Sequence, residues 1–343
     1  MKSSHNFLVV LQLGLAFFWA DRMLCADTPE SVAEHTDTCL LFATFHGNGE
    51  DGLHLVWSDN GVNWKVIQND KSFLQPTVGA KIMRDPSLIQ GPNGVFHMVW
   101  TSGWWEKGIG YASSKDLIHW SEPVELPVMA HEPRAEMCWA PEIRWDEQAQ
   151  EYLIYWSSAL NGETATPAGQ HGPRYFRTYA TTTTDFKKFT PTRLFFDPQT
   201  PKGPKGEGGQ IDASSVKIGD KYYIFYKEGY NPGGIRYASA DTLQGPYKKI
   251  FPMFAQDNSD TNDENYIIWE GPTAIQIGDY CVVYVDRGKK KNPSDRQGAW
   301  RSKDMIHWED ISLKMPFPPG TMHGSVLRVS RSVIQSLDMN VAR

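Results

Sequence analysis

The sequence predicts an all-β fold, a five-bladed β-propeller in a single domain, on two observations. The first is a phrase that recurs five times at intervals of about 55 to 70 residues. The second is a series of short runs rich in β-branched and aromatic residues, bounded by Gly and Asp turns, which is typical of strands. A repeat of this length with several short strands fits a propeller blade better than a β-sandwich.

The recurring phrase follows a Ser–x–Asp/Asn pattern that usually ends in Trp. Its clear copies are SDNGVNW at 58–64, SKDLIHW at 114–120 and SKDMIHW at 302–308, and degenerate copies stand at 183–186 and 239–243. Predicted strands precede most copies, at 97–101, 152–156, 222–226 and 280–286. Residues 39–67 are expected to carry the strands of the first blade. Residues 324–329 are expected to return to that blade and close the ring.

The N-terminus predicts a signal peptide over residues 1–26, followed by one propeller domain over residues 27–343. Lys2 precedes the apolar run 7–19, which has the length of a signal-peptide core and is short for a membrane span. Leu24-Cys25-Ala26 offers a small-residue cleavage site. The alternative is a buried N-terminal helix. No later run is apolar enough to cross a bilayer, so we expect a secreted or periplasmic protein without stable membrane insertion.

The composition limits the classes of partner. A formal net charge of −6 argues against nucleic acid, whose phosphates attract dense Lys and Arg. Thirteen Trp and fourteen Tyr offer flat amphipathic surfaces that can pack a core or stack on sugars. Cys39, Cys138 and Cys281 lack metal-site spacing and are expected to be buried free thiols.

Ionisable residues stand at the beginning of each predicted inner strand. The phrases are RDPS at 84–87, WAPE at 139–142, IDAS at 211–214, WEGP at 269–272 and MHGS at 322–325. In a propeller the starts of the inner strands converge at one mouth of the central channel. A single Asp beside Pro is most often a turn residue, but carboxylates in register with every repeat are costly to desolvate and point to a site.

These ordered phrases resemble those of glycoside hydrolase family 43, over roughly residues 80–330. The resemblance implies a five-bladed propeller that hydrolyses arabinose-, xylose- or galactose-containing glycans with inversion at the anomeric carbon. By position it implies that Asp85 is the general base, Asp212 the modulator of the acid's pKa, and Glu270 the general acid. An inverting hydrolase needs such a base and acid about 6.5–9.5 Å apart, which leaves room for a water molecule.

Further site residues are expected from the same phrases and from the loops beside them. By resemblance, Glu142 accepts a substrate hydroxyl or supports the site, and His323 helps to hold a calcium ion, through water, or a water cluster in the channel. The alternative for His323 is a hydrogen-bonded core histidine. The acidic segment 257–264 lacks the spacing of an EF-hand and is expected to be a solvated loop. The candidate sugar contacts are Arg84, Trp104, Trp105, Trp139, Lys227 and Arg287.

The function that the resemblance implies is exo-acting hydrolysis of a terminal sugar from an oligo- or polysaccharide, with α-L-arabinofuranose as the first choice. A β-xylosidase or a galactan-directed hydrolase would use the same residues. A non-catalytic carbohydrate-binding propeller is the alternative from another class, although such a protein would be expected to lack the base or the acid. A phosphorylase and a retaining hydrolase are further alternatives. No cofactor is required, and a structural calcium ion in the channel is the only one suggested.

Overall fold

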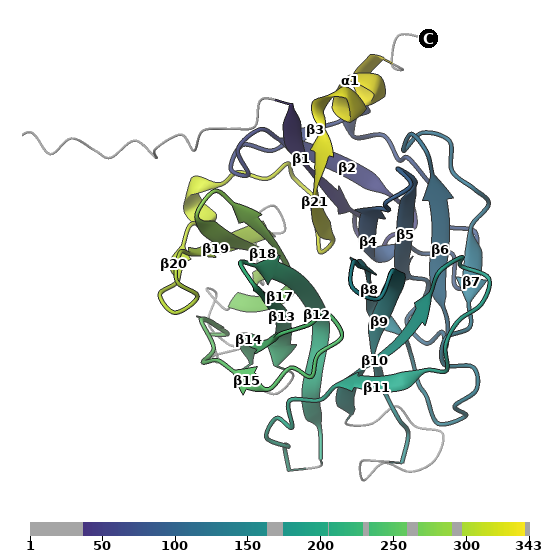
Figure 1. Ribbon diagram of the computed structural model, residues 1–343, viewed down its shortest axis with the longest axis vertical. Coiled ribbons are helices and arrows are strands. Elements are labelled where there is room, and N and C mark those ends of the chain that lie inside the picture. The colour runs from purple at the N-terminus through teal and green to yellow at the C-terminus, as the bar shows by residue number, and fades with distance from the viewer. Residues whose placement is uncertain are drawn as a thin grey trace, which may run out of the picture. The chain divides into compact units, whose positions relative to one another are not determined.

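The computed structural model describes residues 37–162, 174–204, 206–228, 233–258, 267–289 and 297–339. The chain divides into two units, Met1–Val32 and Ala33–Arg343, and every described residue belongs to the second. The predicted signal peptide therefore lies outside the described residues. The regular secondary structure of the described part is almost wholly β-strand, which confirms the all-β class (Figure 1).

The strands form five antiparallel groups, numbered here from the N-terminus. Group 1 contains β21 (Ser325–Ser330), β1 (Thr38–Thr44), β2 (His54–Ser58) and β3 (Lys65–Val66). Group 2 contains β4 (Arg84–Gln90), β5 (Phe96–Thr101), β6 (Ile109–Ser114) and β7 (Val124–Leu126). Group 3 contains β8 (Trp139–Asp146), β9 (Glu151–Ala159), β10 (Tyr175–Thr183) and β11 (Arg193–Phe196). Group 4 contains β12 (Gly208–Ile218), β13 (Lys221–Glu228), β14 (Gly234–Ala240), β15 (Lys249–Ile250) and β16 (Ala255–Gln256). Group 5 contains β17 (Ile267–Ile277), β18 (Tyr280–Lys289), β19 (Gln297–Ser302) and β20 (Glu309–Asp310).

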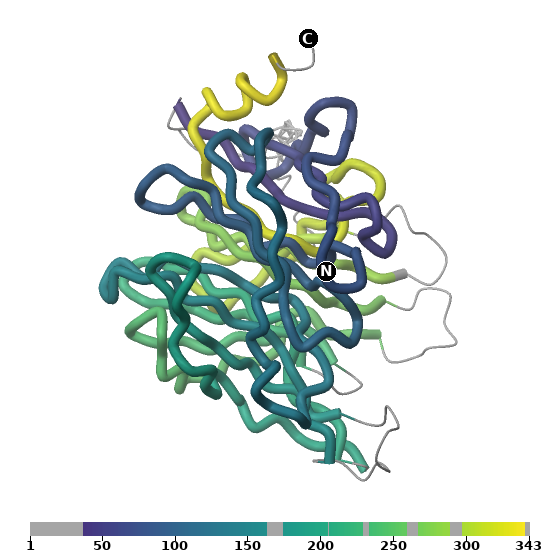
Figure 2. The backbone as a smooth tube through the Cα atoms, turned by 90° about the vertical axis from the view of Figure 1, so that its right-hand side faces the viewer, coloured from purple at the N-terminus to yellow at the C-terminus, as the bar shows by residue number. Residues whose placement is uncertain are grey.

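Group 1 combines both ends of the described chain. β21 pairs antiparallel with β1, from Thr38 opposite Ser330 to Ala43 opposite Ser325, as the sequence predicted. Figures 1 and 2 both show yellow β21 beside purple β1. Groups 3 and 4 are joined into one nine-stranded sheet by a short parallel pairing of β10 with β12.

We number the strands of each group in the order given above, so that the first strands are β21, β4, β8, β12 and β17. These first strands contact one another in a cycle: β21 with β4, β4 with β8, β8 with β12, β12 with β17, and β17 with β21. Backbone–hydroxyl hydrogen bonds reinforce several of these contacts. The backbone N–H of Leu88 in β4 donates to Ser325 Oγ in β21 at 2.8 Å, and that of Val326 in β21 donates to Thr273 Oγ1 in β17 at 3.2 Å. Such bonds satisfy polar groups that the packing removes from water.

The hydrophobic core consists of layers between neighbouring groups. Successive side chains of a strand point to opposite faces, so Leu40 and Phe42 of β1 pack against group 5 while Cys39 and Leu41 pack against group 2. Three further clusters lie between groups 2 and 3, 3 and 4, and 4 and 5. Together the five clusters join all the groups in the same cycle as the first strands.

The recurring phrase forms the turn after the third strand of each group. In the second copy, Ser114 Oγ accepts the backbone N–H of Leu117 at 2.8 Å, and Asp116 Oδ1 accepts that of His119 at 2.8 Å. Leu117 adopts a left-handed conformation with φ of 64°. Since third and first strands run in the same direction, these turns lie far from the phrases that begin the first strands.

The described chain ends in a helix. A C-terminal helix, α1 (Arg331–Met339), was not predicted from the sequence; its Ile334 and Leu337 are buried in the cluster between groups 1 and 2. Among the described residues, no helix has the length and apolar character needed to cross a membrane. Cys39, Cys138 and Cys281 are buried and free, as predicted.

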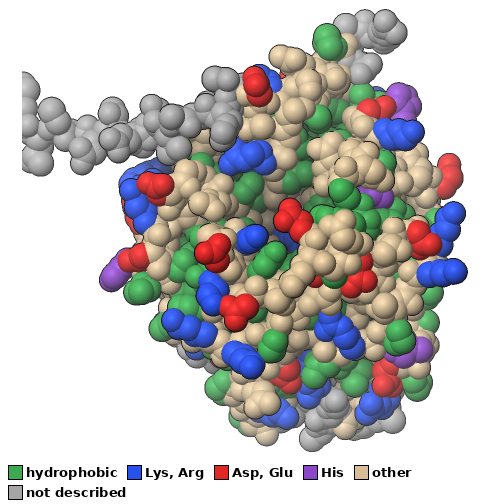
Figure 3. Space-filling model, viewed as in Figure 1, with side chains coloured by type: hydrophobic (Ala, Val, Ile, Leu, Met, Phe, Trp, Pro, Cys, Tyr) green, Lys and Arg blue, Asp and Glu red, His purple; other side chains and the backbone are tan. Residues whose placement is uncertain are grey.

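The charges seen on one face of the molecule are mixed. Lys and Arg side chains alternate there with Asp and Glu, without a continuous basic patch (Figure 3).

Candidate active site

The four predicted acidic site residues, Asp85, Glu142, Asp212 and Glu270, lie at bulges in the first strands. Pairing with the second strand shifts register between Arg84 and Ser87, Trp139 and Glu142, Ile211 and Ser214, and Glu270 and Thr273. Each bulge contains a left-handed residue: Asp85, Ala140, Asp212 or Gly271, with φ between 44° and 57°. A bulge redirects a side chain that would otherwise follow the regular alternation, and left-handed non-glycine residues of this kind cluster at functional sites.

Asp85, Asp212, Glu270 and His323 come from four different strand groups but form one electrostatic group in the structure. We use this term because the charges of Asp85, Glu270 and His323 all act on the carboxyl of Asp212. Asp85 and Asp212 occupy the same bulge position, and Glu270 stands one residue before it. His323 lies two residues before the first residue of β21, and its imidazole Nδ1 lies 3.1 Å from Asp85 Oδ1. The convergence that the sequence predicted is therefore present in the structure.

Asp85 is held by two neighbours. The hydroxyl of Thr101 in β5 donates to Asp85 Oδ2 at 2.9 Å, and His323 holds the other carboxylate oxygen. Burial alone would raise the pKa of Asp85, but the hydrogen bond and charge of His323 outweigh it and hold the pKa below its ordinary value. Asp85 is therefore ionised at neutral pH.

His323 is the positive partner in this group. Burial would lower the pKa of the imidazole, but the hydrogen bond and charge of Asp85, with Asp212 and Asp286, raise it to about 10. A protonated nitrogen cannot bind a metal, and calcium prefers oxygen ligands. Direct calcium ligation by His323 does not fit this arrangement, so the predicted calcium would have to bind through water.

Two carboxyl groups, of half-buried Asp212 and buried Asp286, hold their protons more strongly than usual. Burial raises the pKa of Asp212 to about 6; His323 opposes this rise, and Glu270 and Asp85 add to it. Burial raises the pKa of Asp286 in β18 to about 8, again with His323 opposing and Glu270 adding. Perturbed carboxyl groups of this kind are typical of catalytic centres.

Glu270 is the exposed member of the group. It pairs across β17 and β18 with Asp286, directly before the register shift. The backbone N–H of the next residue, Gly271, donates to Asp212 Oδ2 at 3.1 Å. Asp212 thereby fixes the main chain beside Glu270 as well as adding a charge near it.

An aromatic surface lies beside Asp85. The Arg84 guanidinium carbon lies 4.7 Å from the ring centroid of Phe45 and 4.5 Å from that of Trp104. Trp104 Nε1 donates to Asn48 Oδ1 at 3.1 Å, and Trp139 Nε1 donates to the backbone oxygen of Trp104 at 2.9 Å. Since these contacts fix Trp104 while 44% of it stays exposed, its ring is available for stacking.

Two other predicted sugar contacts are accessible. Trp105 is 45% exposed, and the guanidinium carbon of Arg174 lies 4.8 Å from its ring centroid. Arg287 in β18 is partly buried and lies over Trp269, 5.7 Å from the ring centroid. Trp269 itself is buried and belongs to the core between groups 4 and 5.

Lys227 and Glu142 have structural partners. Lys227 is 7% exposed and forms an ion pair with Asp257. Its ammonium group therefore has a structural partner beside the site. Asp257, predicted to lie in a solvated loop, is buried instead; residues 259–264 of that segment lie outside the described residues. Glu142 is 4% exposed, accepts a hydrogen bond from Ser87 Oγ at 2.8 Å and pairs with Arg144 at 2.7 Å. Of the two roles predicted for Glu142, this placement favours support.

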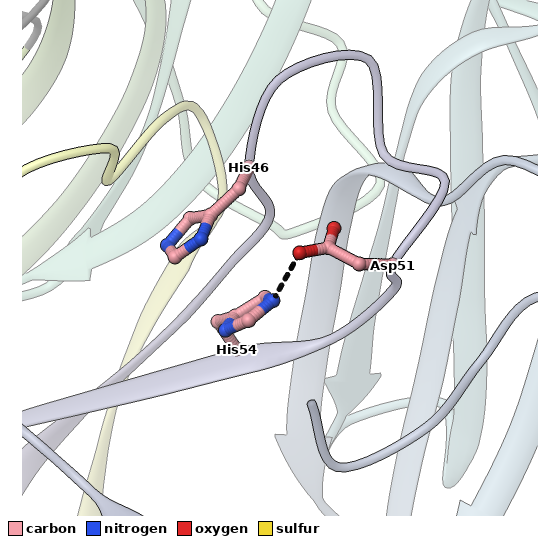
Figure 4. Close-up of side chains that lie close together, drawn as sticks. All are labelled: His46, Asp51 and His54. Carbon is pink, nitrogen blue, oxygen red and sulfur yellow. Dashed lines mark hydrogen bonds and ion pairs between the residues drawn. The ribbon is translucent and has the colours of Figure 1, made fainter. Parts of the chain in front are cut away.

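A His–Asp group braces the loop between β1 and β2. His54 Nε2 lies 3.0 Å from Asp51 Oδ2 (Figure 4). The other ring nitrogen, Nδ1, lies 3.1 Å from Asp70 Oδ1. Ligand atoms of His46, Asp51 and His54 are close enough to suggest a metal site. However, the two imidazole rings stack 3.9 Å apart at 16°, so one ion cannot lie in both ring planes, as coordination by ring nitrogens requires. The group instead stabilises the loop that carries Asn48.

Three members of a set of supporting residues were missed by the sequence analysis, and the fourth, Lys227, was predicted instead as a sugar contact. We call "support position" the second-strand residue that pairs with the residue before each bulge: Thr101, Ser157, Lys227 and Asp286. Thr101 Oγ1 accepts the backbone N–H of Ala140 at 2.8 Å, and Ser157 Oγ accepts that of Asp212 at 3.2 Å. A polar residue near the end of each predicted second strand was the available signal.

Comparison with known proteins agrees with this architecture. Residues 37–334 match the family model described as "Probable glycosyl hydrolase domain" and related to glycosyl hydrolase family 43. An α-L-arabinofuranosidase from Bifidobacterium longum subsp. longum is 28% identical over 217 residues, which are 56% of this chain and 20% of the relative. This chain thus matches about a fifth of that relative's length.

Two solved structures share the fold. A thermostable family-43 glycoside hydrolase superposes with a TM-score of 0.57 at 17% identity, over 85% of this chain and 95% of that one. The α-L-arabinanase of Cellvibrio cellulosa, in complex with arabinohexaose, gives 0.54 at 13% identity, over 85% and 97%. With the family model covering nearly all described residues, the chain belongs to the glycosyl hydrolase family 43-related family.

Proposed function

We propose that this chain is a five-bladed β-propeller that hydrolyses glycosidic bonds with inversion, with Asp85 as general base and Glu270 as general acid. The closed cycle of first strands and core layers supports five blades. The observation that carries the catalytic proposal is the ionised Asp85, held by His323 and Thr101, in one electrostatic group with the exposed Glu270.

In the proposed reaction, ionised Asp85 removes a proton from a water molecule whose oxygen attacks the anomeric carbon. The bond from that carbon to the glycosidic oxygen breaks, and Glu270 donates its proton to the departing oxygen. Asp212 positions Glu270 through the backbone of Gly271. After one turnover Asp85 is protonated and Glu270 ionised, and exchange with solvent restores both.

The proposed substrate is a glycan with a terminal α-L-arabinofuranosyl group. The arabinofuranosidase relative supports this choice, and the stacking surface of Trp104 supports a carbohydrate ligand in general. β-Xylosidase and galactan-directed activities are the alternatives within the same chemistry. A non-catalytic binding protein is disfavoured because all three acids are present and Asp85 has the charge that a base requires.

The deciding experiment is hydrolysis of nitrophenyl glycosides headed by α-L-arabinofuranoside, β-D-xyloside and β-D-galactoside, followed by proton NMR of the first-formed sugar. We expect turnover of one glycoside with the opposite anomer appearing first, and loss of turnover in Asp85→Asn. Asp279→Asn, in the exposed β17–β18 turn, is the matched control and should keep full activity. A product of retained configuration would contradict the inverting mechanism, and binding without turnover would favour the non-catalytic alternative.

We also propose export from the cytoplasm, on the basis of the predicted signal peptide. N-terminal sequencing of protein recovered from the periplasm or medium of an expressing cell should begin at Asp27. A protein retained in the cytoplasm with its first 26 residues intact would contradict the proposal.

A further inference from the structure

Two main-chain N–H groups flank the proposed acid, and a carboxyl group binds each of them. The backbone N–H of Gly271, which follows Glu270, donates to Asp212 Oδ2 at 3.1 Å. The backbone N–H of Trp269, which precedes Glu270, donates to Asp257 Oδ1 at 2.9 Å. The main chain is therefore held by a carboxyl group on each side of the acid, and the second of these, Asp257, has no role in the proposed reaction.

Asp257 is itself fixed from two directions. It directly follows β16, and its backbone N–H donates to the backbone oxygen of Gly233 at 2.9 Å. Its Oδ2 forms an ion pair with Lys227 Nζ, and the two side chains are only 7% and 9% exposed. Because taking two charges out of water is unfavourable unless further hydrogen bonds satisfy them, it is relevant that both carboxyl oxygens of Asp257 have a partner.

Lys227 connects this contact to the other carboxyl group. It occupies the support position of group 4, opposite the residue that precedes Asp212. At the support positions of groups 2 and 3, Thr101 and Ser157 accept a backbone N–H from the first strand of the following group. An ammonium group can only donate, so Lys227 cannot make this contact directly. Asp257, bound to Lys227, supplies the acceptor for the first strand of group 5.

We propose that Asp257, with Lys227 as its counterion, is a positioning residue for the general acid. Asp257 and Asp212 hold the main chain on either side of Glu270, and together they fix the direction in which its side chain leaves the strand. A displacement of about 1 Å in a catalytic group can cost about 100-fold in rate, so the contact bears directly on proton transfer. This inference rests on the proposed function, in which Glu270 protonates the departing oxygen.

The test compares kcat on the methyl and dinitrophenyl glycosides of the sugar that the wild type hydrolyses. A misplaced acid slows the methyl glycoside more, because dinitrophenolate departs with little protonation. Lys227→Met/Asp257→Leu removes the ion pair and the acceptor for the Trp269 N–H, whereas Lys227→Met/Asp257→Asn removes the ion pair and keeps an acceptor oxygen. Removing both charges together avoids leaving one buried charge unpaired. Lys221→Met/Asp241→Asn removes an exposed ion pair of the same strand group and is the matched control.

We expect the leucine variant to lose roughly 10- to 100-fold in kcat on the methyl glycoside and no more than about threefold on the dinitrophenyl glycoside. The asparagine variant should keep the wild-type ratio of the two rates, and the control should match the wild type on both. A leucine variant with the wild-type ratio, or with equal losses on both glycosides, would overturn the inference. Asp257→Ala replaces Asp257→Leu if the larger side chain prevents folding.

Two further measurements separate this inference from the proposed function. If Glu270→Gln itself shows no difference between the two leaving groups, the assignment of the acid fails, and this inference fails with it. If Glu270→Gln shows the difference and the leucine variant does not, only the inference fails. Nitrogen-15 NMR of tryptophan-labelled protein tests the contact without activity: hydrogen exchange of the Trp269 amide should accelerate at least about 10-fold in the leucine variant but not in the asparagine variant. Unchanged exchange in the leucine variant would overturn the inference.

Discussion

The hydroxyl of Thr101 offers a sharp test of how the site holds its base. Thr101 is 2% exposed; its Oγ1 donates to Asp85 Oδ2 at 2.9 Å and accepts the backbone N–H of Ala140 at 2.8 Å. Thr101→Val replaces the hydroxyl by a methyl group of similar size. The change therefore removes both hydrogen bonds while leaving the packing nearly unaltered.

The expected magnitudes follow from those two bonds. A hydrogen bond to a charged group contributes about 1.5–3 kcal/mol, and a buried N–H left without a partner costs about 1–3 kcal/mol. Because the hydroxyl favours the ionised form of Asp85, its loss should raise the pKa of that carboxyl by about one to two units. We expect the acid limb of the kcat/KM profile to move up by that amount, and the free energy of unfolding to fall by roughly 2.5–6 kcal/mol.

The assay is a pH–rate profile on the hydrolysed glycoside together with urea unfolding. Thr101→Ser is the matched control, because it keeps the hydroxyl and loses only a methyl group; its acid limb should stay in place. If Thr101→Val keeps both the wild-type acid limb and the wild-type kcat, then Thr101 does not orient the base and the reasoning fails.

Three further predictions concern the acid, the imidazolium and calcium. Glu270→Gln should lose at least about 100-fold in rate on glycosides with poor leaving groups and less on aryl glycosides, which need less protonation; equal losses on both would remove Glu270 from the acid role. His323 has a raised pKa in the folded state, so its contribution to stability is complete below pH 6.5 and is lost as the pH rises to about 10. Across that range the unfolding free energy of the wild type, measured against that of His323→Gln, should decline by up to about 1.4 kcal/mol per pH unit, and parallel curves would contradict the assignment. If calcium binds in the channel through water, EDTA should lower the midpoint of thermal unfolding and CaCl2 should restore it, whereas an unchanged midpoint would count against the ion.

The sequence alone was sufficient to predict the structural repeat and the recurring position of the acidic residues within it. Ser114 and Asp116 cap their own turn within five residues, so this structure follows from local chemistry and can be recognised as a repeated phrase. Asp85 and Asp212 occupy the same bulge position in two copies of the repeat, groups 2 and 4, so their convergence follows from the repeat itself. Local patterns of this kind carry their information in adjacent residues.

Contacts between groups could not be predicted in the same way. Ser157 supports Asp212 from 55 positions away, and Lys227, chosen as a sugar contact, is buried against Asp257. Which partner each side chain meets depends on how neighbouring groups pack. The helix α1 was missed because Ile334 and Leu337 acquire their role only against the core between groups 1 and 2.

The residue types and their order along the chain thus determined that this protein has a ring of repeated β-strands with acids at one end of its inner strands. The tertiary structure decided the charge on each of those acids. The Asp85 side chain is largely buried and Asp286 is buried, yet the pKa of the Asp85 carboxyl lies below its ordinary value and that of Asp286 rises to about 8. The physical reason is that a proton responds to burial and to every charge nearby, and these charges come from strands that are distant in sequence and adjacent only in the fold.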